Sequence, residues 1–404
     1  MKAWDIERGE ENIIIGMIDS GGDKNHVDGY NVWINKGEIP NNGKDDDNNG
    51  YIDDWWGFNF CYVKGGDNTY EPIDDCGHGT HCHGIAAAIG DNGTGIVGVA
   101  MENVKVMHVK FLNKYGYGTL DNAFKAILYA VDNGADIISM SWGARVPDTL
   151  PIPLLEEALK YAYENNCILV AAAGNNSQPV KFFSPANSKY VLTVAATTSK
   201  DKRAYFSNYG KEVEISAPGS QILSLNAENG WLSRYGPVID EDYLVLSGTS
   251  MATPFVSGAA ALLLSYNSHL SNEYIYRLLQ ETADEIEQDS CVIGPRLNIG
   301  RAMKKLRGEF PREILDVYVY PTIFFGNSIT ISYRLRGDGN ISAGIYDILG
   351  RRIKTLINGK FEAGEYSITW DGRDDKNRVL PPGNYFILFR TEDENVSKKI
   401  LYVK

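Results

Sequence analysis

The chain is poor in positive charge, in histidine and in cysteine, and it has no long hydrophobic run. Its 404 residues hold 39 Lys and Arg against 52 Asp and Glu, a formal net charge of −13. Nucleic-acid binders need clustered cations that this balance does not supply. No stretch approaches the roughly 18 consecutive apolar residues of a membrane span. We therefore expect no nucleic-acid partner and no membrane span.

The N-terminal sequence, MKAWDIERGEENIIIG, lacks the basic and apolar regions of a signal peptide. If the protein is secreted, its leader lies outside this sequence. At roughly 100 to 200 residues per domain, the length predicts two or three domains. Hydrophobic residues at 43% and charged residues at 23% are close to the averages of globular proteins, which excludes a disordered or fibrous chain.

Short apolar runs alternate with helix-length segments from residue 12 to about residue 305. The runs span 13–18, 104–109, 136–141, 168–173 and 191–196. Continuous rather than alternating hydrophobicity is typical of strands covered on both faces, and the intervening helices supply the crossovers of a parallel sheet. We predict a doubly wound α/β domain over residues 1–309.

The pattern changes near residues 308–313. Beyond them, alternating runs such as ISYRL, YSITWDG and NYFILF are separated by Gly, Pro, Asn and Asp. Closely spaced short strands with turn signals indicate a small all-β sandwich, which we place at residues 314–404.

Three polar residues are candidates for catalysis, and a parallel sheet gathers reactive groups at the carboxyl ends of its strands. Asp19 ends the first apolar run, although an Asx turn is the alternative interpretation. His78 lies between two glycines ahead of an Ala-rich segment, yet a single histidine is more often structural. Ser250 follows the run YLVL, where a helix dipole favours a nucleophile but serine is more often an N-cap. Pro254 is expected in the first turn of that helix.

A metal is suggested by the succession His81, Cys82, His83. Zinc sites combine such a group with a second Cys or His cluster at fixed spacing. The sequence has no second cluster of that kind, so we do not expect zinc.

The order Asp19, His78, Ser250, with separations of 59 and 172 residues, is the order of subtilisin and not that of chymotrypsin or the α/β-hydrolases. The segments IIGMIDSG, GHGTH and SGTSMATP resemble the three signature segments of the subtilisin-like serine proteases, the subtilases. The resemblance covers roughly residues 4 to 305. It implies a seven-stranded parallel sheet and endopeptidase activity.

The resemblance also implies a role for each residue. Ser250 would attack the scissile carbonyl, His78 would carry the proton, and Asp19 would orient the imidazole. Asn175, in ILVAAAGNNS, matches the asparagine that stabilises the oxyanion. A Gly-Asn turn is the alternative interpretation of Asn175.

Two further segments, residues 141–143 and 116–118, resemble the segments that hold the substrate backbone in this family. Recognition through the backbone implies broad specificity. An open primary pocket, able to take large apolar side chains, is implied by the small residues near Asn175. Buried core aromatics are the alternative for Trp142 and Tyr117. The substrate-binding candidates are Ser141, Trp142, Gly143, Gly116, Tyr117, Gly118, Ala173 and Gly174.

Calcium is the expected cofactor, first in the acidic loop at residues 45–54. Its D-x-D-x-N-G spacing resembles an EF-hand loop, although Trp56 stands at the position of the final Glu. A solvated acidic loop is the alternative. The candidate ligands are Asp45, Asp47, Asn49, Tyr51 and Asp54. The segment GDNGTGIVGVA resembles a second calcium loop of the family, with Asp28 and Asn92 as ligands.

The chain has five cysteines, an odd number, so at least one thiol stays free or pairs between chains. Cys82 stands where one subtilase branch has a free thiol beneath the catalytic histidine. Cys61 and Cys76 flank a polar loop and are candidates for a bridge. Cys167 and Cys291 are either a pair or core residues.

The C-terminal segment resembles both the FlgD-like immunoglobulin-type domain and the sorting domain of type IX secretion. The first implies a stabilising or binding module and the second an export tag. We expect a secreted, monomeric serine endopeptidase acting on proteins or peptides, matured from a propeptide outside this sequence. The alternatives are a serine esterase and a catalytically silent binding or adhesion protein that works through residues 314–404.

Overall fold

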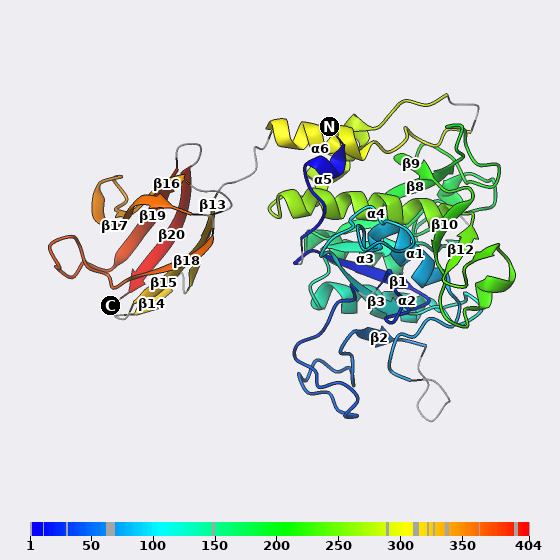
Figure 1. The fold of residues 1–404 in the computed structure, drawn as a ribbon, viewed down its shortest axis with the longest axis horizontal. Helices are drawn as coiled ribbons and strands as arrows, with labels where there is room; N and C mark the ends of the chain where they lie inside the picture. Colours follow the sequence, from blue (N-terminus) through cyan, green and yellow to red (C-terminus); the bar gives the residue numbers. More distant parts are fainter. Residues whose placement is uncertain are drawn as a thin grey trace. The chain divides into compact units, whose positions relative to one another are not determined.

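The computed structural model describes residues 2–10, 12–29, 31–61, 69–147, 150–287, 291–309, 315–320, 323–325, 328–335, 339–362, 364–391 and 395–403. The chain divides into two compact units, Met1–Glu309 and Phe310–Lys404 (Figure 1).

A seven-stranded, fully parallel sheet forms the centre of the first unit, in the order β2-β3-β1-β4-β6-β8-β9. The strands are β1 (Ile14–Asp19), β2 (Gly57–Asn59), β3 (Lys105–Lys110), β4 (Ile137–Met140), β6 (Ile168–Ala172), β8 (Leu192–Thr197) and β9 (Ile215–Pro218). Strands β4, β6 and β8 are buried at every position. Burial on both faces explains their continuous hydrophobicity and confirms the predicted doubly wound sheet.

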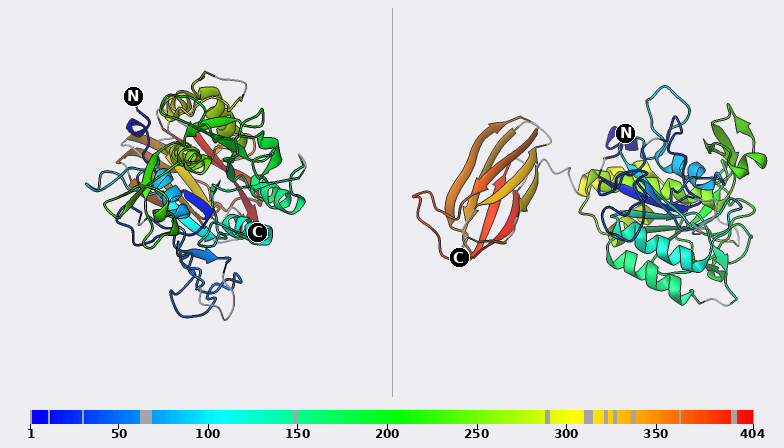
Figure 2. Two further views of the ribbon diagram at one scale, coloured as in Figure 1. Left: turned by 90° about the vertical axis from the view of Figure 1, so that its right-hand side faces the viewer. Right: turned by 90° about the horizontal axis from the view of Figure 1, so that it is seen from below.

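Helices cover both faces of this sheet (Figure 2, right). Side chains of β1 alternate between the two faces: Ile15 and Met17 pack with α1 and α4, whereas Ile18 packs with α2 and α3. The helices are α1 (His78–Ala87), α2 (Leu120–Asp132), α3 (Pro153–Glu164), α4 (Thr249–Tyr266), α5 (Asn272–Thr282) and α6 (Ile299–Glu309). Both α5 and α6 add to the core on the α4 side.

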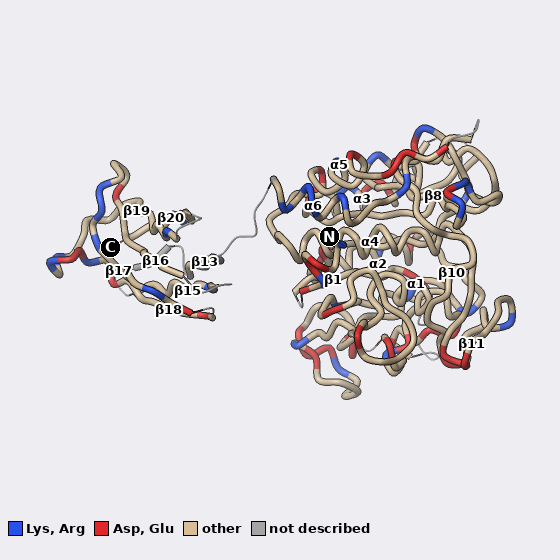
Figure 3. Tube along the Cα trace, turned by 45° about the horizontal axis from the view of Figure 1, so that its top comes forward, with Lys and Arg blue, Asp and Glu red and all other residues tan. Residues whose placement is uncertain are grey.

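Smaller elements border the sheet. Strands β10 (Ile222–Leu225), β11 (Val238–Ile239) and β12 (Tyr243–Leu246) form an antiparallel sheet, and β5 (Ala144–Arg145) pairs with β7 (Phe183–Ser184). Short 3-10 helices are η1 (Ala3–Asp5), η2 (Val180–Phe182) and η3 (Trp231–Arg234). Among the described residues, no helix combines the length and apolarity needed to cross a membrane. Lys and Arg are interspersed with Asp and Glu along the chain (Figure 3).

The second unit consists of two β-sheets, ordered β13-β15-β18 and β14-β20-β19-β16-β17. Its strands are β13 (Leu315–Tyr320), β14 (Ile323–Phe325), β15 (Ile329–Leu335), β16 (Gly339–Tyr346), β17 (Arg352–Phe361), β18 (Gly364–Trp370), β19 (Gly383–Arg390) and β20 (Asn395–Val403). Burial alternates strictly along β15, and the core includes Trp370, Ile387 and Phe389. This confirms the predicted all-β domain.

The edge of the central sheet holds a partly buried carboxyl whose ionisation opposes folding. Glu214, just before β9, accepts a hydrogen bond from the Thr193 backbone N–H at 2.8 Å. Burial raises the pKa of Glu214 to about 7. The unfolded chain has the lower pKa, about 4.3, so this group costs the folded state stability as pH rises through that window.

We expect Glu214→Gln to raise the melting temperature relative to the wild type above pH 7, because the amide keeps an acceptor for Thr193 and carries no charge. Below about pH 4, Glu214 of the wild type is protonated in the folded and in the unfolded state, so the wild type and the variant are expected to melt alike. Calorimetry across pH measures the difference. Glu157→Gln, on the exposed side of α3, is the control. A melting difference independent of pH would contradict the prediction.

Candidate active site

Asp19 and His78 meet at the carboxyl end of β1. Asp19 is its last residue and fully buried, and His78 is the first residue of α1. The distance from His78 Nδ1 to Asp19 Oδ1 is 2.8 Å, and the same oxygen accepts the Ser20 N–H at 2.7 Å. Burial lowers the pKa of His78, but the charge of Asp19, the neighbouring Cys82 sulfur and the hydrogen bond to Asp19 together raise it by more, so the net pKa lies well above its usual value. The carboxylate therefore holds the ring by Nδ1 and favours the imidazolium.

Close packing of α1 against β1 depends on glycine. A Cβ atom at Gly79 would lie 2.2 Å from the Gly21 carbonyl oxygen, so any side chain there would force the helix away. Gly77, before His78, has φ +94°, a left-handed conformation that favours glycine. The glycines on both sides of His78 are thus required by the backbone.

Asp74 is a positioning residue that the sequence analysis did not single out. It is buried, and its Oδ1 accepts from the Gly77 N–H at 2.7 Å, while its Oδ2 accepts from the Thr80 N–H at 2.8 Å. Burial alone raises the pKa of Asp74, but Lys110 and these hydrogen bonds lower it below its usual value. The N-cap residue of α1 is Gly77, which carries no capping side chain, so Asp74 supplies the acceptor for the first turn and fixes the turn that carries His78. An Asp a few residues before a glycine-rich helix start was the available signal.

Ser250 is the second residue of α4, which begins at Thr249, so Pro254 lies beyond the first turn. The expectation that it falls in the first turn is wrong. Proline has no N–H to donate to the carbonyl four residues earlier, which is that of Ser250. This carbonyl instead accepts from Ser141 Oγ at 3.0 Å and from Cys82 Sγ at 3.4 Å. Pro254 is tolerated because other donors satisfy the acceptor it leaves open.

The Ser250 hydroxyl donates to the Ser141 carbonyl at 2.9 Å. Among the described residues it makes no hydrogen bond to His78, although Cys82 links the two residues. Cys82 Sγ lies 3.9 Å from His78 Nδ1 as well as in contact with the Ser250 carbonyl. Burial raises the pKa of the Cys82 thiol, so this sulfur is a neutral packing group.

Asn175 is fixed to the start of α4 by its side-chain oxygen. That oxygen accepts from the Thr249 N–H at 2.8 Å and from the Thr249 hydroxyl at 3.1 Å. Because the oxygen is engaged, the amide NH₂ of this exposed residue remains available as a donor. Gly174, with φ +100°, supplies the preceding turn, and a Cβ there would lie 2.4 Å from Asn208 Nδ2. Ala173 is buried.

Ser141, Trp142 and Gly143 follow β4, next to Ser250. The Trp142 indole N–H donates to the Ile18 carbonyl at 2.9 Å, and its ring packs edge-on against Phe111 at 4.7 Å. The Trp142 side chain is therefore partly buried and packs against the core. Gly143 approaches strand β7 closely, since a Cβ atom at Gly143 would lie 3.2 Å from the Ser184 carbonyl oxygen.

The other candidate substrate segment, Gly116–Gly118, forms a tight turn. The Asn113 N–H donates to the Tyr117 carbonyl at 2.9 Å, and the Gly116 N–H donates to the Asn113 carbonyl at 2.8 Å. Tyr117 is 73% exposed, so the alternative of a buried core aromatic is wrong for this residue.

The acidic loop folds around its own carboxylates and around Glu38, which the sequence analysis did not single out. Side-chain oxygens of Glu38, Asp45 and Asp47 lie within 4.8 Å of one another. Glu38 Oε2 is buried and has no hydrogen-bond partner among the described residues. Asn49 Nδ2 donates to Asp54 Oδ2 at 3.0 Å, and burial raises the pKa of Asp54. Tyr51 packs its ring on the adjoining aromatics. The donor set suits a hard cation, with Glu38 in place of the missing final Glu.

Asp28 and Asn92 also lie together, but their oxygens are already engaged. Asp28 Oδ1 accepts from Asn92 Nδ2 at 2.6 Å, and Asp28 Oδ2 accepts from the Ile96 N–H and the Tyr243 hydroxyl, each at 2.9 Å. Asn92 Oδ1 accepts from the Thr94 N–H. The calcium site predicted at Asp28 and Asn92 stays a prediction; the acidic loop differs in that Glu38 Oε2 has no hydrogen-bond partner among the described residues.

The remaining histidines of the predicted succession face separate partners. His81 Nε2 contacts the Leu244 carbonyl at 2.9 Å. His83 Nδ1 lies 3.1 Å from His108 Nε2, and its Nε2 lies 2.9 Å from Asn31 Oδ1. Burial lowers the pKa of His81 to about 3 and that of His108 to about 4, so both rings are neutral near pH 7.

The thiols of Cys76 and Cys167 are free, as is that of Cys82. Neither candidate bridge therefore forms, and the interpretation of Cys61 with Cys76 as a disulfide is wrong. Burial raises the pKa of Cys76 to about 11, so this thiol is unreactive despite lying two residues from His78. Cys167 is a buried core residue.

Both units match known families. The subtilase family matches residues 10–305, and the FlgD Ig-like domain matches residues 323–392. A thermophilic serine proteinase of Bacillus sp. (strain AK1) is 37% identical over 284 residues, which is 70% of this chain but only 59% of the relative's length. Thermitase of Thermoactinomyces vulgaris is 35% identical over 285 residues, covering 70% of this chain and 85% of thermitase.

Solved structures agree with the sequence matches. Proteases from Pseudoalteromonas arctica PAMC 21717 superpose with a TM-score of 0.60 at 26% identity, covering 75% of this chain and 92% of that one. A cold adapted subtilisin-like serine proteinase superposes with a TM-score of 0.55 at 28% identity, covering 71% and 89%. The chain therefore belongs to the subtilase family of serine endopeptidases, and a FlgD Ig-like domain follows its peptidase domain.

Proposed function

We propose that this chain is a secreted endopeptidase of broad specificity that works through Asp19, His78 and Ser250. The observation that carries the proposal is the 2.8 Å hydrogen bond between Asp19 and His78, beside a serine at the start of α4. Residues 1–309 would form the peptidase domain and residues 314–404 an immunoglobulin-like module. A relative from Bacillus subtilis (strain 168), 41% identical over 218 residues, is a cell wall-associated protease, which supports action outside the cell.

The first chemical step moves the Ser250 proton. Rotation about the Ser250 Cα–Cβ bond takes the hydroxyl from the Ser141 carbonyl toward His78 Nε2, because Nδ1 is held by Asp19. His78 accepts the proton as Oγ bonds to the scissile carbonyl carbon. Asp19 stabilises the imidazolium without taking the proton. The imidazolium then protonates the leaving amine, and water hydrolyses the acyl-enzyme by the same steps.

The Asn175 amide NH₂ and the Ser250 backbone N–H would donate to the oxygen that becomes negative. The hydrogen bonds from Thr249 hold the Asn175 side chain in advance of the reaction. Such preorganised donors stabilise the transition state because they need no reorientation as charge develops.

Substrate would lie extended between Ser141–Gly143 and Gly116–Gly118, with backbone hydrogen bonds to these segments. Recognition of the backbone leaves most side chains unselected, so broad specificity follows. Gly174, which has no side chain, would border the primary pocket and leave it open to large apolar groups.

The acidic loop would hold Ca²⁺ through carboxylates of Glu38, Asp45 and Asp47 and the side-chain oxygen of Asn49, with the Tyr51 carbonyl and Asp54 completing the candidate set. The buried, unpartnered Glu38 Oε2 supports this fit. A bound cation would offset the repulsion among these groups and thus stabilise the loop.

We expect Ser250→Ala to lower kcat on peptide nitroanilides about 10⁶-fold, because the nucleophile is lost. We expect Asn175→Ala to lower kcat about 10² to 10³-fold, with a smaller effect on KM. Steady-state kinetics and labelling by a fluorophosphonate probe measure both. Ser268→Ala, exposed beyond the end of α4, is the control. An unchanged rate for Ser250→Ala would contradict the proposed function.

The pH profile reports on His78, which must be neutral to accept the Ser250 proton. Its raised pKa places the acid limb of kcat/KM above the usual histidine range, so activity rises toward alkaline pH. In Asp19→Asn, burial remains but the negative charge is gone. We expect the acid limb to move to lower pH and kcat to fall about 10⁴-fold. If the acid limb of Asp19→Asn lay at the same pH as that of the wild type, Asp19 would not be the group that raises the pKa of His78.

We expect EDTA to lower the melting temperature of the wild type and added Ca²⁺ to restore it, by about 2–4 °C for each kcal/mol of linked binding free energy. Glu38→Gln combined with Asp47→Asn is expected to abolish this response. Asp121→Asn, exposed in the first turn of α2, should keep it. A wild type insensitive to EDTA would remove calcium from the proposed function.

A further inference from the structure

We propose that three aromatic residues form a wall of the substrate groove that selects a large apolar or aromatic side chain just before the scissile residue. These residues are Tyr115, Trp231 and Tyr235, which we call the aromatic wall. The inference rests on the proposed peptidase function and adds a specificity determinant to it. The scissile residue is the one whose carbonyl is attacked.

The wall lies directly against the turn that carries His78. The N–H groups of residues 231 and 232 donate to the carbonyls of residues 75 and 76, at 3.1 and 2.8 Å. The two backbones also meet through glycine, since a Cβ at Gly230 would lie 3.1 Å from the Gly77 Cα. A substrate residue that passes His78 must therefore pass this segment.

The rings join this segment to the proposed substrate segment Gly116–Gly118. Tyr115 packs edge-on against Trp231, with centroids 5.1 Å apart and planes at 84°, and Trp231 also lies 6.3 Å from Tyr235. Tyr115 is 51% exposed and Tyr235 is 70% exposed. Exposed rings gathered at one place gain by burial against another apolar surface, and aromatic partners add a ring–ring contribution.

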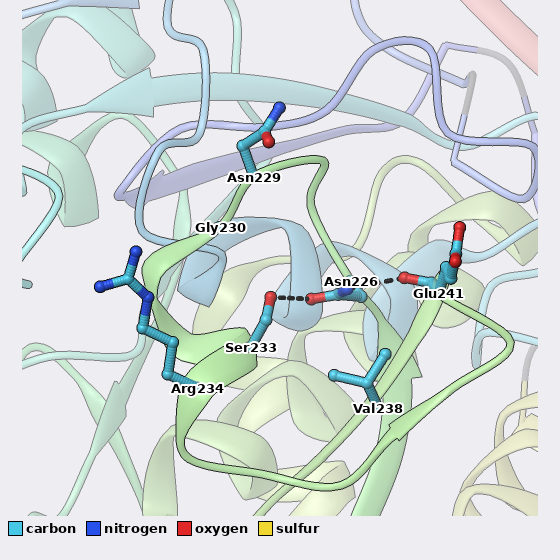
Figure 4. A pocket seen from close by; sticks show the side chains of 7 residues that line it. All are labelled: Asn226, Asn229, Gly230, Ser233, Arg234, Val238 and Glu241. Carbon is cyan, nitrogen blue, oxygen red and sulfur yellow. Dashed lines mark hydrogen bonds between the residues drawn. The ribbon is translucent and has the colours of Figure 1, made fainter.

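Hydrogen bonds hold both sides of the wall in place before substrate arrives. Asn113 Oδ1 accepts from the Tyr115 N–H at 2.9 Å. On the other side, Ser233 Oγ donates to Asn226 Oδ1 at 2.8 Å, and Asn226 Nδ2 donates to the Glu241 carbonyl at 2.7 Å, beside a hollow of about 460 Å³ (Figure 4). A preorganised wall loses little entropy on binding, which favours selection by shape.

Cations already occupy faces of these rings. The Arg234 guanidinium carbon lies 4.3 Å from the Trp231 ring centroid, and Lys114 Nζ lies 4.9 Å from the Tyr115 ring centroid. A Lys or Arg side chain of the substrate would meet like charge there. The wall therefore favours Phe or Leu over Ala and disfavours Lys.

The test uses the full chain and succinyl-Ala-Ala-X-Phe-nitroanilides in which X is Phe, Leu, Ala or Lys. We expect kcat/KM to be about tenfold higher for X = Phe than for X = Ala, and lowest for X = Lys. Trp231→Ala should bring the Phe-to-Ala ratio to about one, and Trp231→Phe should keep most of it. Tyr161→Ala, an exposed aromatic on α3, is the matched control and should leave the ratio unchanged.

A wild-type Phe-to-Ala ratio near one, or an unchanged ratio in Trp231→Ala, overturns the proposal. If Trp231→Ala does not fold by circular dichroism, Tyr235→Ala takes its place, with the same expected fall and the same contrary outcome. Calorimetric binding of the Phe and Ala peptides to Ser250→Ala separates this inference from the proposed function. If the wild type cleaves no peptide, the peptidase function fails. If Ser250→Ala binds the Phe peptide more tightly than the Ala peptide, and adding Trp231→Ala abolishes the difference, the aromatic wall is still supported. Equal binding of the two peptides to Ser250→Ala overturns it.

Discussion

The hydrogen bond between Asp19 and His78 is the interaction on which the rest of the first unit depends. Asp19 is fully buried, and a buried carboxylate is stable only when it is paired and hydrogen-bonded. To bring His78 to it, α1 must approach the end of β1 more closely than any side chain at Gly79 would allow. Asp74, whose ionised form is favoured by the charge of Lys110 and which backbone N–H groups hold in place, then fixes the turn before the histidine. The glycines and acids around His78 thus serve one contact.

The position of Ser250 follows from a second local constraint, the missing N–H of Pro254. The carbonyl that this leaves open is satisfied by Ser141 at the end of β4, and the Ser250 hydroxyl returns a hydrogen bond to the Ser141 carbonyl. The start of α4 is therefore tied to the central sheet by two reciprocal hydrogen bonds. Small residues make the approach of the helices possible, because a Cβ at Gly258 on α4 would lie 2.7 Å from the Ala86 carbonyl of α1. Substrate would then meet groups that are already in place.

Much of the fold was predictable because burial on both faces leaves a continuous apolar run, and β1, β4, β6 and β8 all show one. The short signature segments around Asp19, His78 and Ser250 likewise indicated the candidate catalytic residues. Two residues that the sequence did not indicate, Glu38 and Trp231, were overlooked for the same reason. Glu38 lies several residues ahead of the acidic loop, and Trp231 lies in a segment far from His78 along the chain. Neither has a local pattern that points to its partner, and the paired-cysteine interpretation failed because spacing carries no information on distance between thiols.

The sequence by itself determined the class of each unit, the order of the three candidate catalytic residues and the glycines that flank His78. These depend on short-range effects: backbone sterics, the period of burial along a strand and the chemistry of a few adjacent side chains. Only the tertiary structure decided that Ser250 hydrogen-bonds to Ser141, that Asp28 is already satisfied by protein donors and that Trp231 adjoins Tyr115. Those outcomes depend on contacts between segments distant along the chain, whose geometry is set when the helices and loops pack against the sheet.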